Sequence, residues 1–118
     1  MRKRRNIIHA LHTPLELMVG TALLAIPFAL GFATSGLIAS VVLGALLIGI
    51  ALAGTGSGRG TVHPTAHADL DLGMALGLLA GAVLLGLTGE GVGFAVLLGG
   101  GLVELALTAF TRYGTATA

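Results

Sequence analysis

The chain has 118 residues, of which six are Lys or Arg and five are Asp or Glu, giving a formal net charge of +1. Only 9% of the residues are charged and 55% are hydrophobic, whereas a soluble domain carries roughly 25% charged residues. These few charged groups cannot cover a water-facing surface, which excludes an ordinary soluble domain. The absence of cysteine excludes disulfides, thiolate metal sites and cysteine nucleophiles.

Four apolar runs follow a basic arm at residues 1–13. We predict membrane-spanning helices at about 15–33, 36–53, 70–88 and 91–110, with tight turns at 34–35 and 89–90, a Gly-rich loop at 54–69 and a tail at 111–118. Each run of about 18–20 residues spans the ~30 Å hydrocarbon core at roughly 1.5 Å per residue. Backbone polar groups in lipid must be satisfied within their own segment, so the runs are expected to be helical. The sequence therefore predicts an all-α integral membrane four-helix bundle.

The first run also fits a secretory signal, because it follows a basic segment. Its apolar stretch is longer than the usual 7–15 residues or so of a signal, and the third run matches it. We therefore expect the first run to remain as a transmembrane helix.

A shift of 55 residues aligns residues 12–54 with residues 67–109 without a gap. The aligned pairs include His12 with His67 and Glu16 with Asp71. This indicates two tandem two-helix repeats, at 14–53 and 70–110. Because each repeat crosses the membrane twice, the copies are expected to be parallel and related by a pseudo-two-fold axis along the membrane normal.

The positions of the basic residues predict the orientation. All six fall in the arm, in the 54–69 loop or in the tail, which lie on one side of the predicted membrane: Arg2, Lys3, Arg4, Arg5, Arg59 and Arg112. The positive-inside rule makes this side cytoplasmic, so both termini are predicted to be cytoplasmic.

The segment from Leu17 to Phe32 reads LMVGTALLAIPFALGF, with a glycine, an apolar stretch, the pair Pro27-Phe28 and then Leu-Gly-Phe. It resembles the first helix of the SPW-repeat family of small bacterial membrane proteins. Ile26 stands where the motif has Ser, and Phe28 where it has Trp. The resemblance implies a multi-pass protein of the bacterial inner membrane, and it carries no catalytic residues.

Three acidic side chains are candidates for binding an ion or a partner. Glu104 lies deep in the fourth run, where a lone carboxylate costs roughly 2.5–3.5 kcal/mol on insertion scales. It is therefore expected to face the bundle interior, to be paired, or to be protonated. Glu16 and Asp71 are shallower, and the segment Thr13-Pro14-Leu15-Glu16 is typical of a helix-capping box. Capping is the favoured interpretation for Glu16 and for the Asp71 region.

The four histidines all lie on the predicted cytoplasmic side: His9, His12, His63 and His67. His12 and His67 are repeat equivalents, so they are expected to approach each other across the pseudo-axis. Neutral imidazoles bind zinc, copper or haem iron. The favoured interpretation is nevertheless that these histidines are solvated side chains at the membrane interface. No cofactor is expected.

Small residues recur at four-residue intervals on two predicted helices. Such stripes allow close helix contact, and these are expected to form seams between the hairpins or with a partner: Gly73, Gly77 and Gly81, and Gly36, Ser40 and Gly44. Pro27 lies within a predicted helix and is expected to kink it.

These features favour a non-enzymatic structural or accessory membrane protein. It would contact lipid, itself or a larger membrane complex, and it would not bind nucleic acid. The alternative is a small proton or cation channel or transporter that uses Glu104. A haem or metal binder that uses the histidines is the third class.

Overall fold

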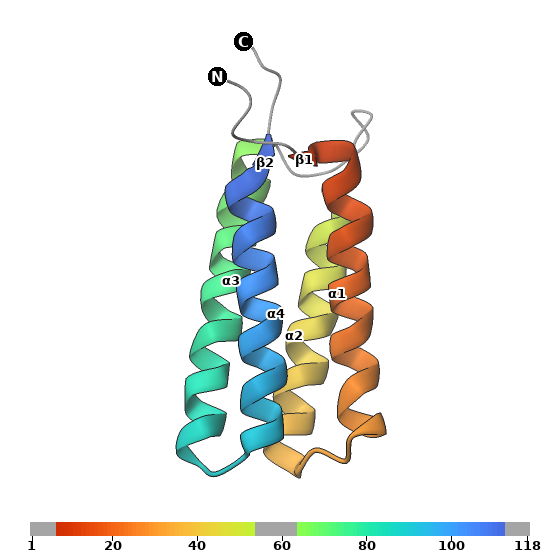
Figure 1. Cartoon of the computed structure of the whole chain (residues 1–118). Helices are drawn as coiled ribbons and strands as arrows, with labels where there is room; N and C mark the ends of the chain where they lie inside the picture. Colours follow the sequence, from red (N-terminus) through yellow and green to blue (C-terminus); the bar gives the residue numbers. More distant parts are fainter. Residues whose placement is uncertain (1–6, 54–63, 113–118) are drawn as a thin grey trace.

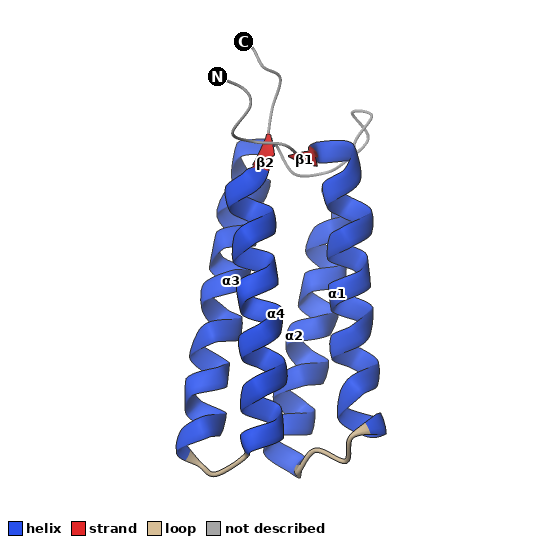
Figure 2. Ribbon diagram, in the orientation of Figure 1, coloured by secondary structure: helices blue, strands red, loops and turns tan. Residues whose placement is uncertain are grey.

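The computed structural model of the chain describes residues 7–53 and 64–112. Within these residues four helices run alternately up and down as an elongated bundle (Figure 1): α1 (His9–Ala29), α2 (Thr34–Ala53), α3 (Pro64–Leu87) and α4 (Gly91–Phe110). Two short strands, β1 (Ile7–Ile8) and β2 (Thr111–Arg112), pair in parallel at one end (Figure 2). We call this the strand end of the bundle. The opposite end, which carries the α1–α2 and α3–α4 turns, is the turn end.

All four helices are long and apolar enough to cross a membrane. Large apolar side chains point outward along the bundle, and Leu87, Met18 and Phe28 are each at least 67% exposed. Water would disfavour such a surface, whereas lipid tails solvate it. The prediction of four apolar, membrane-length helices is confirmed.

Two of the helices begin more than one turn before their apolar runs. α1 begins at His9 and α3 at Pro64, although the runs predicted starts near 15 and 70. The polar residues before each run extend the helices, because helical geometry depends on backbone bonding and not on hydropathy. Thr13 and Glu16 therefore lie inside α1, and Asp71 lies inside α3. The capping interpretation of these residues is wrong.

Glycine ends the first helix of each hairpin. Gly31 has φ 68° and Gly89 has φ 87°, which is the left-handed conformation that favours glycine. The Phe32 N–H donates to the Pro27 carbonyl at 2.9 Å, and the Glu90 N–H donates to the Leu85 carbonyl at 2.8 Å. Each of these bonds joins residues five positions apart, as in a Schellman motif, which satisfies the last carbonyls of a helix. As a result α1 ends at Ala29, earlier than the predicted residue 33.

The middle of the bundle is apolar and closely packed. Leu23, Leu47, Leu78 and Leu97, one from each helix, are buried. Ser40 of α2 donates a hydrogen bond to the Leu23 carbonyl of α1 at 2.6 Å. A Cβ added at Gly44 would lie 2.9 Å from both the Gly20 carbonyl oxygen and the Leu23 Cβ. Small residues on α2 therefore let the backbones of α1 and α2 approach each other.

The two stripes of small residues contact different parts of the bundle. Ser40 and Gly44 pack against α1 within the first hairpin, and not between hairpins as expected, whereas Gly36 of the same stripe faces Glu90 of the second hairpin. Gly77 and Gly81 of α3 face Leu43 of α2, across the seam between the hairpins. A Cβ at Gly73 would contact nothing within 4 Å. The buried Pro27 lies two residues before the end of α1, and its kink remains a prediction.

Glu90 joins the two hairpins at the turn end. Its carboxylate accepts a hydrogen bond from the Ala33 backbone N–H at 3.0 Å, and Ser35 lies 3.5 Å away. A side chain at Gly36 would collide with the same carboxylate. The turns of both hairpins are thus held together by one acidic side chain.

Gly44→Ala is expected to destabilise the bundle by about 1–3 kcal/mol, the usual range for overpacking. The added methyl group would meet backbone atoms of α1, which cannot move without separating the helices. Thermal unfolding in detergent, followed by circular dichroism, measures the effect. Gly49→Ala, on the same helix, is the control, because a Cβ added at Gly49 would meet nothing within 4 Å. Equal melting temperatures for the two variants would contradict this packing.

Candidate metal centre

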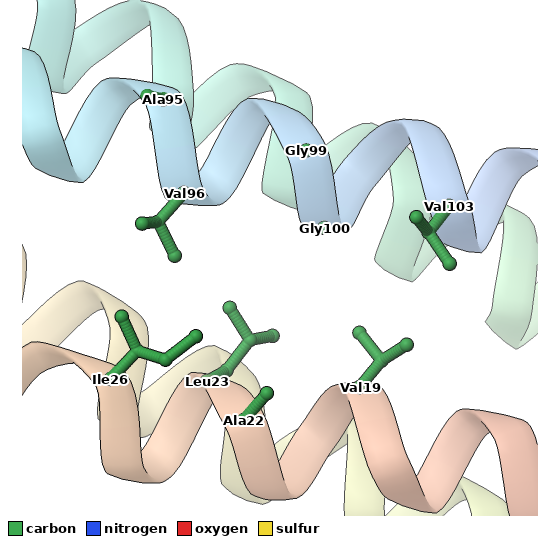
Figure 3. Close-up of a pocket in the computed structure, with 9 residues that line it drawn as sticks. All are labelled: Val19, Ala22, Leu23, Ile26, Ala95, Val96, Gly99, Gly100 and Val103. Carbon is green, nitrogen blue, oxygen red and sulfur yellow. The ribbon is translucent and has the colours of Figure 1, made fainter.

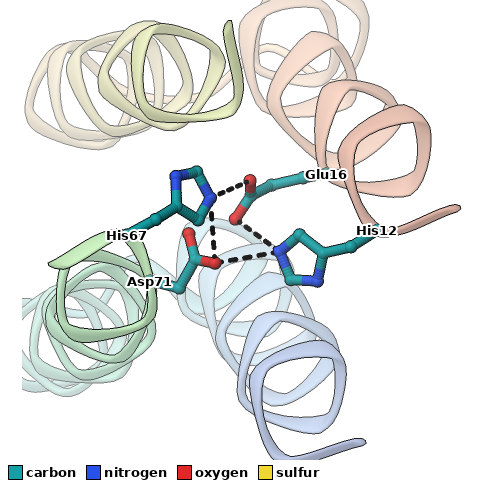
Figure 4. Close-up of side chains that lie close together, drawn as sticks. All are labelled: His12, Glu16, His67 and Asp71. Atoms are coloured by element: carbon teal, nitrogen blue, oxygen red, sulfur yellow. Dashed lines mark ion pairs between the residues drawn. The ribbon is translucent and has the colours of Figure 1, made fainter. Parts of the chain in front are cut away.

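The inward faces of α1 and α3 change from apolar to polar near the strand end. His12 and Glu16 lie four residues apart on α1, and His67 and Asp71 lie four residues apart on α3. Residues at this spacing share one face of a helix. Both faces point into the bundle, so the four side chains converge, as Figure 4 shows. We call these four residues the His–carboxylate cluster.

Each imidazole of the cluster contacts both carboxylates. His12 Nε2 lies 3.3 Å from Glu16 Oε2 and 2.9 Å from Asp71 Oδ2. His67 Nε2 lies 3.6 Å from Glu16 Oε1 and 3.2 Å from Asp71 Oδ2. The contacts cross between α1 and α3, so the cluster links the first hairpin to the second.

These distances match those between neighbouring ligands of a metal ion. Ligand atoms placed 2.0–2.1 Å from a tetrahedral zinc ion are separated by about 3.3 Å. One ligand atom from each of the four residues lies within 4.8 Å of the other three. Small movements of the side chains would therefore place all four atoms around one ion.

The cluster is shielded from solvent. All four side chains are 0% exposed. With neutral imidazoles, the two carboxylates would leave two uncompensated negative charges inside an apolar bundle, which is strongly unfavourable. Two protons on the imidazoles or one divalent cation would balance this charge. The site is therefore built to hold positive charge.

Thr111 supports His12 from outside the cluster. His12 Nδ1 lies 2.7 Å from Thr111 Oγ1, and both side chains are buried. Thr111 directly follows α4, where β2 pairs with β1. Metal-binding histidines usually donate their second ring N–H to such an oxygen, which fixes the direction of the ring. Here the bond leaves Nε2 facing the carboxylates.

Glu104 of α4 reaches the same end of the bundle. Its side chain is 0% exposed, and its carboxyl group lies beside that of Glu16. Neither of its oxygens has a hydrogen-bond partner in the part of the chain that the structure describes. Buried polar atoms are rarely left in this state, which makes Glu104 a candidate for binding a cation or a proton beside the cluster.

The structure brings together five of the residues singled out from the sequence: His12, Glu16, His67, Asp71 and Glu104. His63 lies outside the described residues, and of His9 only its place at the start of α1 is described. Thr111 was missed by the sequence analysis. Its only signal was its place at the end of α4, and nothing in the sequence pairs it with His12.

An apolar groove of about 300 Å³ runs between α1 and α4 (Figure 3). Valine, leucine and isoleucine side chains and small residues line it, among them Val19, Leu23 and Gly100. None of the lining side chains carries an oxygen or nitrogen atom, so the groove offers no ligand to a cation.

Thr111→Val is expected to destabilise the bundle by about 1–3 kcal/mol, because it removes the buried partner of His12 Nδ1. Thr111→Ser keeps the hydroxyl group and should retain most of the stability. Thermal unfolding of both variants in detergent, with chelator present, tests the bond. Equal stability of the two variants would show that the hydroxyl does not support His12.

No protein-family model matches the chain, and neither does any curated protein or solved structure. The resemblance of residues 17–32 to the SPW-repeat family stays a prediction.

Proposed function

We propose that this protein binds one divalent transition-metal ion within its helical bundle, through His12, Glu16, His67 and Asp71. The observation that carries the proposal is the convergence of four buried ligand atoms from two helices within 4.8 Å of one another. Imidazole nitrogen combined with carboxylate oxygen suits zinc, iron and manganese ions.

A bound ion would act as a crosslink. His12 and Glu16 belong to the first hairpin and His67 and Asp71 to the second, so one ion joins α1 to α3 at the strand end. Glu90 already joins the hairpins at the turn end. An ion that binds only the folded bundle stabilises it by about 2.7 kcal/mol at a concentration 100 times its dissociation constant.

Such a crosslink is compatible with the structural or accessory role predicted from the sequence. Lateral contact with another copy or a larger membrane complex stays part of the proposal, supported by the exposed apolar side chains along all four helices. The tandem repeat is supported by the 55-residue offset between His12 and His67 and between Glu16 and Asp71. Cytoplasmic termini in a bacterial inner membrane are supported by the Lys and Arg pattern.

Passage of protons or cations through the bundle has less support. The polar side chains reach from the strand end to Glu104, and the next buried layers toward the turn end contain leucines such as Leu23, Leu78 and Leu97. An ion would find no ligand among those side chains. The arrangement favours a binding site that is closed toward the turn end.

Metal binding is expected at one ion per chain. The protein, purified in detergent through a tag without histidine and stripped with chelator, should bind Co²⁺ as a zinc substitute and develop visible d–d absorption. Zn²⁺ should displace Co²⁺ and raise the melting temperature. His67→Gln and Asp71→Asn should each weaken metal binding by at least about 10-fold. Loss of an outer-shell partner alone typically lowers metal affinity by about 10–100-fold, and these two residues are proposed direct ligands.

Glu90→Gln is the matched control, because it removes a carboxylate at the turn end, far from the cluster. It should leave the affinity and the stoichiometry unchanged. If the wild-type protein gives neither absorption nor a thermal shift with Co²⁺ or Zn²⁺, the proposal is wrong. The cluster would then be a hydrogen-bonded network of histidines and carboxylates.

A further inference from the structure

We propose that Glu104 is a fifth ligand of this site, and that it shifts the selectivity of the site from Zn²⁺ toward Mn²⁺ or Fe²⁺. This inference rests on the proposed metal binding. It assigns a metal class to the site, and it assigns a role to a buried carboxylate that the four-residue cluster does not use.

The buried carboxyl group of Glu104 lies against that of Glu16, and no imidazole or cationic side chain pairs with it among the described residues. Its side chain is 0% exposed, and neither oxygen has a hydrogen-bond partner among the residues that the structure describes. Its nearest acidic neighbour is Glu16, which is itself a member of the cluster. Two buried carboxyl groups in contact repel each other unless a proton or a cation lies between them. A cation bound by Glu16 is therefore within reach of Glu104.

The helices place Glu104 just beneath the cluster. Thr111, which directly follows α4, lies level with His12, as their hydrogen bond shows. Glu16 is four residues along α1 from His12, or about 6 Å toward the turn end. Glu104 is seven residues back along α4 from Thr111, or about 10 Å. Glu104 thus approaches the site from its inner side, opposite the histidines.

Helix α4 supplies this carboxylate, and its repeat equivalent α2 does not. The position 55 residues before Glu104 is Gly49 of α2, and Gly49 is exposed on the outside of the bundle. The donor set is therefore two imidazole nitrogens and three carboxylates, contributed by α1, α3 and α4.

This donor set points to a metal class. Structural zinc sites are almost always four-coordinate, and the four-residue cluster already satisfies zinc. Manganese prefers oxygen ligands, and iron sites combine histidine with carboxylate. A third carboxylate adds oxygen ligation that Mn²⁺ and Fe²⁺ use and Zn²⁺ does not require. Zinc binds most sites more tightly than manganese, so the effect of Glu104 should appear in the ratio of the two affinities.

The test compares Mn²⁺ and Zn²⁺ binding in wild type and in Glu104→Gln. Free Mn²⁺ gives a six-line electron paramagnetic resonance signal that decreases on binding, and competition against bound Mn²⁺ gives the Zn²⁺ affinity. Glu104→Gln should weaken Mn²⁺ binding at least 10-fold and Zn²⁺ binding less than about threefold, because a four-coordinate site remains. Glu104→Asp, which keeps a carboxylate, should recover part of the Mn²⁺ affinity.

The outcomes separate this inference from the proposed function. Unchanged Mn²⁺ affinity in Glu104→Gln would overturn the inference, because glutamine can replace a protonated carboxyl group but not a carboxylate ligand. Equal losses for both metals would also overturn it, since Glu104 would then support the fold of the site and not its selectivity. If the wild-type protein binds neither metal, the proposed function itself fails. Glu90→Gln should change neither affinity.

Discussion

Buried charge at the strand end is the constraint around which this bundle is organised. Five ionisable side chains, from α1, α3 and α4, lie out of contact with solvent, inside helices that are long and apolar enough to cross a membrane. Each would be costly there alone. The four residues of the His–carboxylate cluster can compensate one another, because each imidazole contacts two carboxylates from different hairpins. Breaking the pairing between hairpins would leave uncompensated charge on both sides.

The packing of the rest of the bundle also holds the two hairpins together, as the buried charge requires. Small residues on α2 bring its backbone close to α1, and leucines from all four helices fill the middle. At the turn end Glu90 connects the hairpins through backbone and side-chain hydrogen bonds. The hairpins are therefore linked by polar contacts at both ends and by apolar packing between them. A metal ion at the strand end would strengthen one of these links without requiring any new contact elsewhere.

The positions of the buried polar side chains favour binding of an ion over passage of an ion through the bundle. Polar atoms occur at successive depths from His12 to Glu104. Beyond Glu104 the buried side chains of the described residues are leucine, alanine, glycine and Pro27, with Ser40 bonded to a backbone carbonyl. An ion bound in the cluster would therefore exchange through the strand end. A closed polar pocket with four or five convergent donors is what a tightly held ion requires, whereas a conducting path needs ligands along its whole length.

Hydropathy alone determined the class of this protein and the approximate helices, because lipid admits only segments whose backbone bonds are satisfied internally. The helices at 36–53 and 91–110 were predicted within two residues for that reason. Hydropathy could not locate the starts of α1 and α3, since their first turns are polar, and it therefore misread Glu16 and Asp71 as caps. The histidine and carboxylate positions were visible in the sequence as two i, i+4 pairs 55 residues apart. Only the tertiary structure decided that these pairs face each other in the core, with Thr111 behind one imidazole and Glu104 beneath, because such contacts depend on how two hairpins pack and not on the pattern within either one.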